Sequence, residues 1–347
     1  MLRTLKIPLS QNQNTLVMQI VLNNFGVSLG RDNEGFVITT QDGRQRIPVV
    51  GVTSILVAKG ALISTDAMLL AIENEIEVII CDRHGEPQGR IWSPKYGSIS
   101  TIRKGQLSFT YSKDAVDFIK DILEKKINNQ QAIILSLEGL ELDYGEKHKL
   151  SKKAIERLEE YKRKIRELEA ERITDVASLL RGWEGVSAKL YFESVNLFLP
   201  ERYRFSQRTQ HPALDIANSL LNYGYGILYG KIEGALIKAG IDPYIGVLHR
   251  DEYNRPVLVY DIIELYRVWV EFVVFELLKQ NIITEEFYSV SDDGSYWLEP
   301  LGRRILIQSL NDYLEEVVDG ETLRRSREVQ ITLFIQQLAQ TFKNLSI

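Results

Sequence analysis

One histidine and two carboxylates lie close together in the sequence, and their chemistry is that of a metal site. His249 ends an apolar run, and Asp261 and Glu264 follow it three residues apart. The apolar residues around the two acids recur at helical spacing, at Ile262, Leu265, Val268, Trp269 and Phe272. Side chains three apart on a helix share a face, so both acids should project from one side. An imidazole with carboxylates is the ligand set expected for manganese or magnesium.

A third acid, Glu184, stands in an unusual setting between Gly182-Trp183 and Gly185. Glycines cost backbone entropy and bring no side chain to pack, so a purely structural acid is hard to explain here. Two interpretations stay open: Glu184 is a further metal ligand, or it begins a helix, where a carboxylate favours the unpaired amides. The chain has 47 acidic residues and 4 histidines, so the group formed by the other two acids and the histidine can also be a chance neighbourhood.

Two further histidines and the single cysteine are explained by structure rather than chemistry. His84 lies in a turn and is interpreted as a solvated loop residue. His211 precedes Pro212, which should open a helix with Asp215 in its first turn, so it is interpreted as a helix-entry residue. Cys81 lies in an apolar, strand-like run, which is typical of a buried structural thiol.

The composition is that of a globular protein, and we expect it to stay in the cytoplasm. Its 347 residues favour two domains, with 44% hydrophobic and 26% charged residues. No apolar run approaches a membrane span, and the N-terminus lacks the features of a signal peptide. The net charge is −5. Nucleic-acid binding would therefore need a local basic surface.

The elements that must position these residues divide the chain into two parts. Short β-rich runs fill the first hundred residues, with a hairpin turn at Asp42-Gly43 and a helix N-cap at Ser64 or Thr65. From Lys113 onward the apolar period is helical. We therefore expect an α+β protein with an N-terminal β domain (1–95), a linker (96–112) and a larger helical domain (113–347) that carries the metal site.

Five motifs in order give the chain a specific resemblance. They are Lys126-Ile-Asn-Asn-Gln130, Arg181-Gly-Trp-Glu-Gly185, Pro212-x-x-Asp-x-x-Asn218, Ala239-Gly-Ile-Asp-Pro-x-Ile-Gly-x-x-His249 and Asp261-x-x-Glu264-x-x-Arg267. This series resembles the family of CRISPR adaptation integrases, the first of the CRISPR-associated proteins. The resemblance implies an N-terminal β-sandwich that serves dimerisation, an all-α catalytic domain, a homodimer, and a complex with the small second CRISPR-associated protein.

The resemblance also implies an activity. It is a metal-dependent DNA endonuclease and integrase, which joins 3′-hydroxyls of spacer precursors to CRISPR repeat DNA and cleaves branched or linear DNA. Manganese suits a histidine-containing site better than magnesium, which prefers oxygen ligands. Two alternatives stay open: a non-catalytic DNA-binding scaffold with structural acids, and a metal-dependent hydrolase of a small phosphoester.

Individual residues carry over from the family as expectations. Glu184, His249 and Glu264 match its metal ligands, and Asp261 matches the neighbouring catalytic acid. Many relatives have aspartate at the position of Glu264, so the resemblance leaves the roles of the last two acids open. The candidates for DNA contact are Arg250, Arg267, Tyr229, Tyr260, Arg208 and Lys189. The two tyrosines can equally pack helices, and the two arginines beside the ligands can pair with nearby acids.

Overall fold

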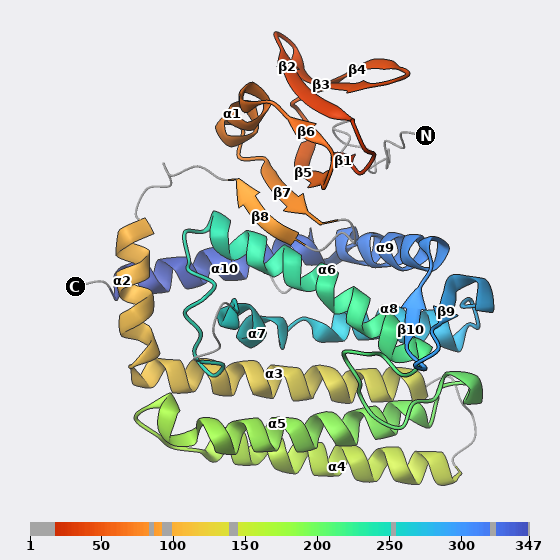
Figure 1. The fold of residues 1–347 in the computed structure, drawn as a ribbon. Helices are drawn as coiled ribbons and strands as arrows, with labels where there is room; N and C mark the ends of the chain where they lie inside the picture. The colour runs from red at the N-terminus through yellow and green to blue at the C-terminus, as the bar shows by residue number, and fades with distance from the viewer. Residues whose placement is uncertain are drawn as a thin grey trace. The chain divides into compact units, whose positions relative to one another are not determined.

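The computed structural model describes residues 18–82, 87–91, 99–138, 145–250, 255–319 and 324–345. They form two compact units that divide between Gly97 and Ser98. The first unit is rich in strands and the second is mostly helical, which confirms the predicted fold class (Figure 1). His84 lies outside the described residues. Within those ranges, no helix has the length and apolar character needed to cross a membrane.

Two four-stranded sheets build the N-terminal unit. The first has the order β1 (Met18–Leu22), β5 (Val52–Ala58), β7 (Glu77–Cys81) and β8 (Pro87–Ile91), with only β8 antiparallel to its neighbour. The second has the order β4 (Gly43–Pro48), β3 (Gly35–Thr40), β2 (Ser28–Asp32) and β6 (Leu62–Ile63), with only β6 parallel to its neighbour. The predicted hairpin at Asp42 joins β3 to β4.

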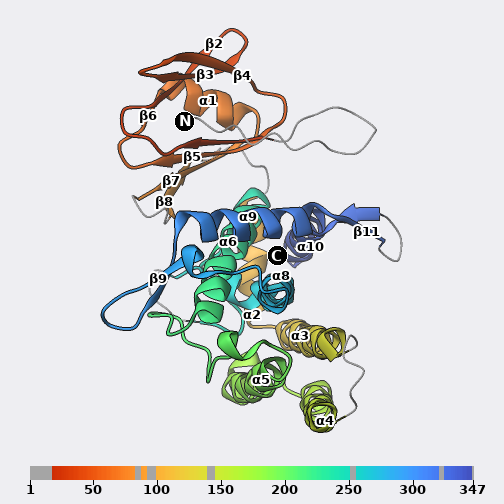
Figure 2. The same ribbon diagram turned by 90° about the vertical axis from the view of Figure 1, so that its right-hand side faces the viewer.

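One apolar core holds the two sheets together. Alternate residues of the second sheet point inward, among them Phe36, Ile38 and Ile47, and they share a buried cluster with Ile55 and Val78 of the first. Helix α1 (Thr65–Glu73) packs in the same unit (Figure 2). The predicted N-cap Ser64 accepts a hydrogen bond from the Ala67 amide. Cys81 is buried, as predicted.

The C-terminal unit consists of helices with two small hairpins. The helices are α2 (Ile99–Thr110), α3 (Lys113–Glu138), α4 (Glu146–Glu167), α5 (Ile173–Asn196), α6 (Ile216–Lys238), α7 (Val257–Ile263), α8 (Arg267–Lys279), α9 (Pro300–Glu315) and α10 (Arg327–Asn344), with 3₁₀ turns η1 (Glu201–Tyr203) and η2 (Glu285–Phe287). The hairpins pair β9 (Tyr288–Val290) with β10 (Tyr296–Leu298), and β11 (Val317–Asp319) with β12 (Arg324–Ser326). Figures 1 and 2 show α3, α4 and α5 side by side.

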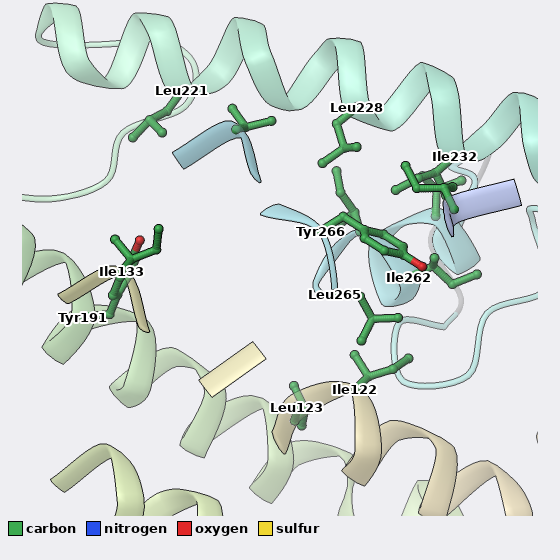
Figure 3. Close-up of a cluster of buried hydrophobic side chains, with 14 of the residues drawn as sticks. Ile122, Leu123, Ile133, Tyr191, Leu221, Leu228, Ile232, Ile262, Leu265 and Tyr266 are labelled. Atoms are coloured by element: carbon green, nitrogen blue, oxygen red, sulfur yellow. The ribbon is translucent and has the colours of Figure 1, made fainter. Parts of the chain in front are cut away.

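The core of this unit lies where α3, α5, α6 and α7 meet. The apolar face of α3 contributes Ile122, Leu123 and Ile133 (Figure 3). Leu228 of α6 and Tyr191 of α5 belong to the same buried cluster. Burial of this many apolar side chains is what holds the helices in fixed positions, and it fixes the polar residues that the same helices carry.

Two local predictions about these helices are wrong, and one of the two interpretations of Glu184 is excluded. The segment 96–112, predicted as a linker, contains α2, which tertiary hydrogen bonds from Gln106 to the carbonyls of Asp242 and Ile245 hold in place. Glu184 lies inside α5 and does not begin a helix. Pro212 does not open α6, because Asp215 is its N-cap and accepts a 2.7 Å hydrogen bond from the Asn218 amide.

The helix predicted to carry both Asp261 and Glu264 is also broken. Helix α7 ends at Ile263, and Leu265 and Tyr266 donate to the carbonyls three residues back, which tightens the chain into a turn before α8 begins. Glu264 is the C-cap residue of α7. The two acids therefore do not project from one face of a continuous helix, and each takes part in its own set of contacts.

Candidate active site

Three separate segments bring the predicted ligands to one place. Glu184 comes from the middle of α5, Glu264 from the end of α7, and His249 from the connection between α6 and α7. Helix α3 lies between α5 and α7 in Figure 1. The charges of Glu264 and Glu184 both act on the His249 imidazole. These three side chains therefore lie near enough to one another for their charges to interact.

Asp261 holds the loop that carries His249. Its carboxylate is buried and accepts hydrogen bonds from the amides of Val247 (2.6 Å), Leu248 (3.2 Å) and His249 (3.0 Å). It also contacts Nδ1 of the His249 ring at 2.8 Å. With Nδ1 occupied, Nε2 is the ring nitrogen left for another partner, and no described residue hydrogen-bonds to it. A carboxylate behind a histidine in this way fixes the ring and its tautomer, as in many metal sites.

Lys126 of α3 stands between the two glutamates. Its Nζ lies 2.5 Å from Oε2 of Glu264 and forms an even shorter ion pair with Oε1 of Glu184. Arg267 pairs with the other oxygen of Glu264, at 2.9 Å. In the described part of the chain, no three histidine, cysteine or acidic side chains are arranged to hold a metal ion. The donors for an ion are present, but as placed two of them engage an ammonium group.

The electrostatics of the site follow from burial and these pairs. Burial opposes ionisation of Glu264, but Arg267 and Lys126 outweigh it and lower the pKa of the carboxyl. Burial likewise opposes a charged Lys126, and Glu264 and Glu184 together raise its pKa. For His249, burial is outweighed by the hydrogen bond and charge of Asp261, so its pKa is raised.

A second buried polar group lies beside the site, and the sequence motifs did not indicate it. Glu271 of α8 is buried and accepts 2.7 Å hydrogen bonds from the hydroxyls of Tyr191 and Tyr225. Burial raises the pKa of Glu271 against the opposing effect of the tyrosine hydroxyls. Arg267 stacks over the Tyr225 ring, 4.9 Å from its centre, and Arg208 stacks over it at 5.5 Å. Sequence alone offers no signal for this group beyond an acid in an apolar helix.

The DNA-contact candidates fall into two classes by exposure. Arg208 is engaged inside the chain, because its guanidinium donates to the side-chain oxygens of Asn218 and Asn222. Arg250 donates to the carbonyls of Val247 and Thr110. Lys189 is the exposed candidate, with 76% of its side chain accessible and a loose 3.8 Å pair to Glu193.

The two candidate tyrosines lie next to the histidine. The rings of Tyr229 and Tyr260 are 5.4 Å apart, and the Tyr260 ring is 6.0 Å from the His249 ring. Burial raises the pKa of Tyr229, so its hydroxyl stays protonated at neutral pH. A pair of aromatic rings beside an imidazole can pack helices together or can form one wall of a binding site, and the geometry fits either role.

The family model for CRISPR associated protein Cas1 matches residues 20–312. The chain therefore belongs to the Cas1 family, as its motifs predicted. The CRISPR-associated endonuclease Cas1 1 of Archaeoglobus fulgidus is 31% identical over 328 residues, which are 92% of this chain and 93% of the relative. The endonuclease Cas1 2 of Rhodospirillum rubrum is 27% identical over 329 residues, with 92% and 93% covered. The names of these relatives support a nuclease.

Solved structures share the fold. A chain of a Cas6-RT-Cas1–Cas2 complex has a TM-score of 0.74 at 23% identity and covers 96% of this chain and 36% of its own length. A Cas1 protein from Thermotoga maritima has a TM-score of 0.73 at 21% identity, with 93% and 96% covered. A casposase bound to integration product has a TM-score of 0.63 at 20% identity, with 94% and 95% covered. At these identities the likeness is one of fold.

Proposed function

We propose that this chain is a metal-dependent DNA endonuclease and integrase of CRISPR adaptation, with Glu184, His249 and Glu264 as the ligands of a Mn²⁺ or Mg²⁺ ion. The observation that carries the proposal is the convergence of these three side chains from three segments, with Asp261 fixing the imidazole. Membership of the Cas1 family and relatives named as endonucleases support it.

Each residue contributes a specific part of the chemistry. His249 offers Nε2, because Asp261 occupies Nδ1, and the glutamates offer carboxylate oxygens. A divalent ion held there supplies a Lewis acid, which polarises a phosphoryl oxygen and stabilises the leaving alkoxide. Glu264 is the direct ligand in this scheme, and Asp261, with both oxygens bound to amides and the ring, acts through the histidine.

The same site accommodates two nucleophiles. When the 3′-hydroxyl of a spacer precursor attacks the phosphorus at the end of a repeat strand, a new phosphodiester forms, the 3′ oxygen of the adjoining nucleotide leaves, and strand transfer results. When water attacks, the outcome is cleavage. Joining a spacer to both ends of a repeat requires two sites at a fixed separation, and a homodimer supplies them. The likeness in fold to a chain of a Cas6-RT-Cas1–Cas2 complex supports a partnership with the small second CRISPR-associated protein.

The decisive experiment is a cleavage and strand-transfer assay on branched DNA, with Mn²⁺ and with a chelator. We expect activity in Mn²⁺, none in chelator, and none in Glu184→Ala. A matched control is Glu193→Ala, since Glu193 is an exposed acid on the same helix that pairs loosely with Lys189. Nicking by Glu184→Ala at the wild-type rate would remove Glu184 from the site.

The other function classes are distinguished by the same samples. A non-catalytic scaffold would bind DNA in chelator and never cut it. A hydrolase of small phosphoesters would turn over a substrate such as p-nitrophenyl phosphate without affinity for DNA. Either result would overturn the proposed function.

A further inference from the structure

Lys126 contacts both proposed carboxylate ligands at once. Its Nζ forms ion pairs with Glu184 on α5 and with Glu264 at the end of α7, and it reaches them from α3. The contact with Oε2 of Glu264 has the distance of an ion pair but not the geometry of a hydrogen bond, since that oxygen has no hydrogen-bond partner among the described residues. The ammonium also donates a hydrogen bond to Oε1 of Glu184, so it ties the two carboxylates together, and a divalent ion bound by both would have to take its place.

Burial explains why a cation is needed at this point. Lys126 is 7% exposed and Glu264 is 8% exposed, and a buried charge without a partner is strongly destabilising. Glu184 and Glu264 carry two negative charges, and Lys126 and Arg267 carry two positive charges. The group is thus electrically balanced before any metal binds. A divalent ion added to a balanced group gains little attraction unless one of the cations moves away.

We propose that Lys126 is the counter-cation of the Glu184–Glu264 pair in the metal-free protein, and that a divalent ion binds only as the ammonium leaves the two carboxylates. Lys126 is then a positioning residue, which keeps the acids together and sets how tightly the ion binds. It can act in this way only if the proposed function is right about the two ligands.

Titration calorimetry with Mn²⁺, in the absence of DNA, tests the proposal. We expect Lys126→Met to bind Mn²⁺ at least about tenfold more tightly than the wild type, because no ammonium competes for the carboxylates. The matched control is Lys125→Met on the same helix, where Lys125 is 55% exposed and pairs with Asp121. This control should bind Mn²⁺ like the wild type. Lys126→Arg, which keeps the positive charge, should bind as weakly as the wild type.

The same Mn²⁺ titrations also show whether the role of Lys126 is only structural. If Lys126 only ties three helices together, Lys126→Met will be less stable and will bind Mn²⁺ with unchanged or weaker affinity, and this outcome overturns the proposal. If Lys126→Met does not fold properly, Lys126→Gln takes its place in the Mn²⁺ titration. Glutamine loses the charge but keeps N–H donors for the carboxylates. Glu184→Ala separates the two ideas, because unchanged Mn²⁺ binding in that variant would refute the proposed metal site itself.

Discussion

Replacing Asp261 by asparagine tests how the histidine is positioned, and the structure gives the size of the effect. Oδ1 of Asp261 accepts from the His249 amide and faces its Nδ1, while Oδ2 accepts from the amides of Val247 and Leu248. In asparagine one oxygen becomes an NH₂ donor. The cheaper orientation turns this donor toward Nδ1, which leaves only the His249 amide without an acceptor and costs about 1–3 kcal/mol.

The same orientation changes the chemistry of the ring. A donor facing Nδ1 favours the tautomer with its proton on Nε2, and that nitrogen must be deprotonated to bind a metal. We therefore expect Asp261→Asn to lower Tm by roughly 2–12 °C. Its Mn²⁺ affinity should fall by about 10–100-fold yet remain measurable, as is usual when a residue that hydrogen-bonds to a metal ligand is replaced.

Thermal melts and Mn²⁺ calorimetry on the purified variant measure both effects. Asp293→Asn is the matched control, because Asp293 lies in an exposed hairpin turn where one oxygen accepts both bonds from Ser295. It should leave Tm and Mn²⁺ affinity unchanged. An unaltered Tm in Asp261→Asn would refute the hydrogen-bond reasoning. Complete loss of Mn²⁺ binding would instead make Asp261 a direct ligand.

Two further predictions concern neighbouring residues. Burial raises the pKa of Glu271 above its ordinary value of 4.5, so its contribution to stability is complete below that value and is lost as pH rises through the raised pKa. Relative to the wild type, Glu271→Gln should therefore become more stable as the pH rises from acidic to neutral. A difference in unfolding free energy between the two proteins that stays constant with pH would contradict this prediction. Arg250→Ala should weaken binding to all DNA sequences alike, and the slope of the logarithm of the binding constant against the logarithm of salt concentration should fall in magnitude by about one. An unchanged slope together with a lower Tm would mean that Arg250 only holds the carbonyls of Val247 and Thr110.

Much of the fold could be predicted from local patterns. Alternating apolar residues and the Asp42 turn indicated the β3–β4 hairpin, and the helical period from Lys113 indicated α3. Helix α2 was missed because Gly105 and several polar residues weaken its pattern. It is stabilised by partners distant in sequence, such as the carbonyl of Asp242 that accepts from Gln106. Local propensity cannot predict bonds of that kind.

The contacts among the proposed site residues could not be predicted from the sequence. The apolar spacing around Glu264 continues across the break between α7 and α8, so the turn that contains this acid could not be predicted from spacing. Lys126 stood in a recognised motif, yet its ion pair joins residues 58 positions apart. Tertiary packing alone brings such charges together, which is why the balance of charge at the site could not be predicted from spacing.

The central claim is that Glu184, His249 and Glu264 hold one divalent ion. Anomalous diffraction at the manganese edge, from crystals of the wild-type protein with Mn²⁺ and a short DNA carrying a 3′-hydroxyl, tests it most directly. We predict one strong peak in contact with both glutamates and with Nε2 of His249, and no contact with Asp261. A peak bound to Asp261, or an ion held away from the two glutamates, would contradict the account.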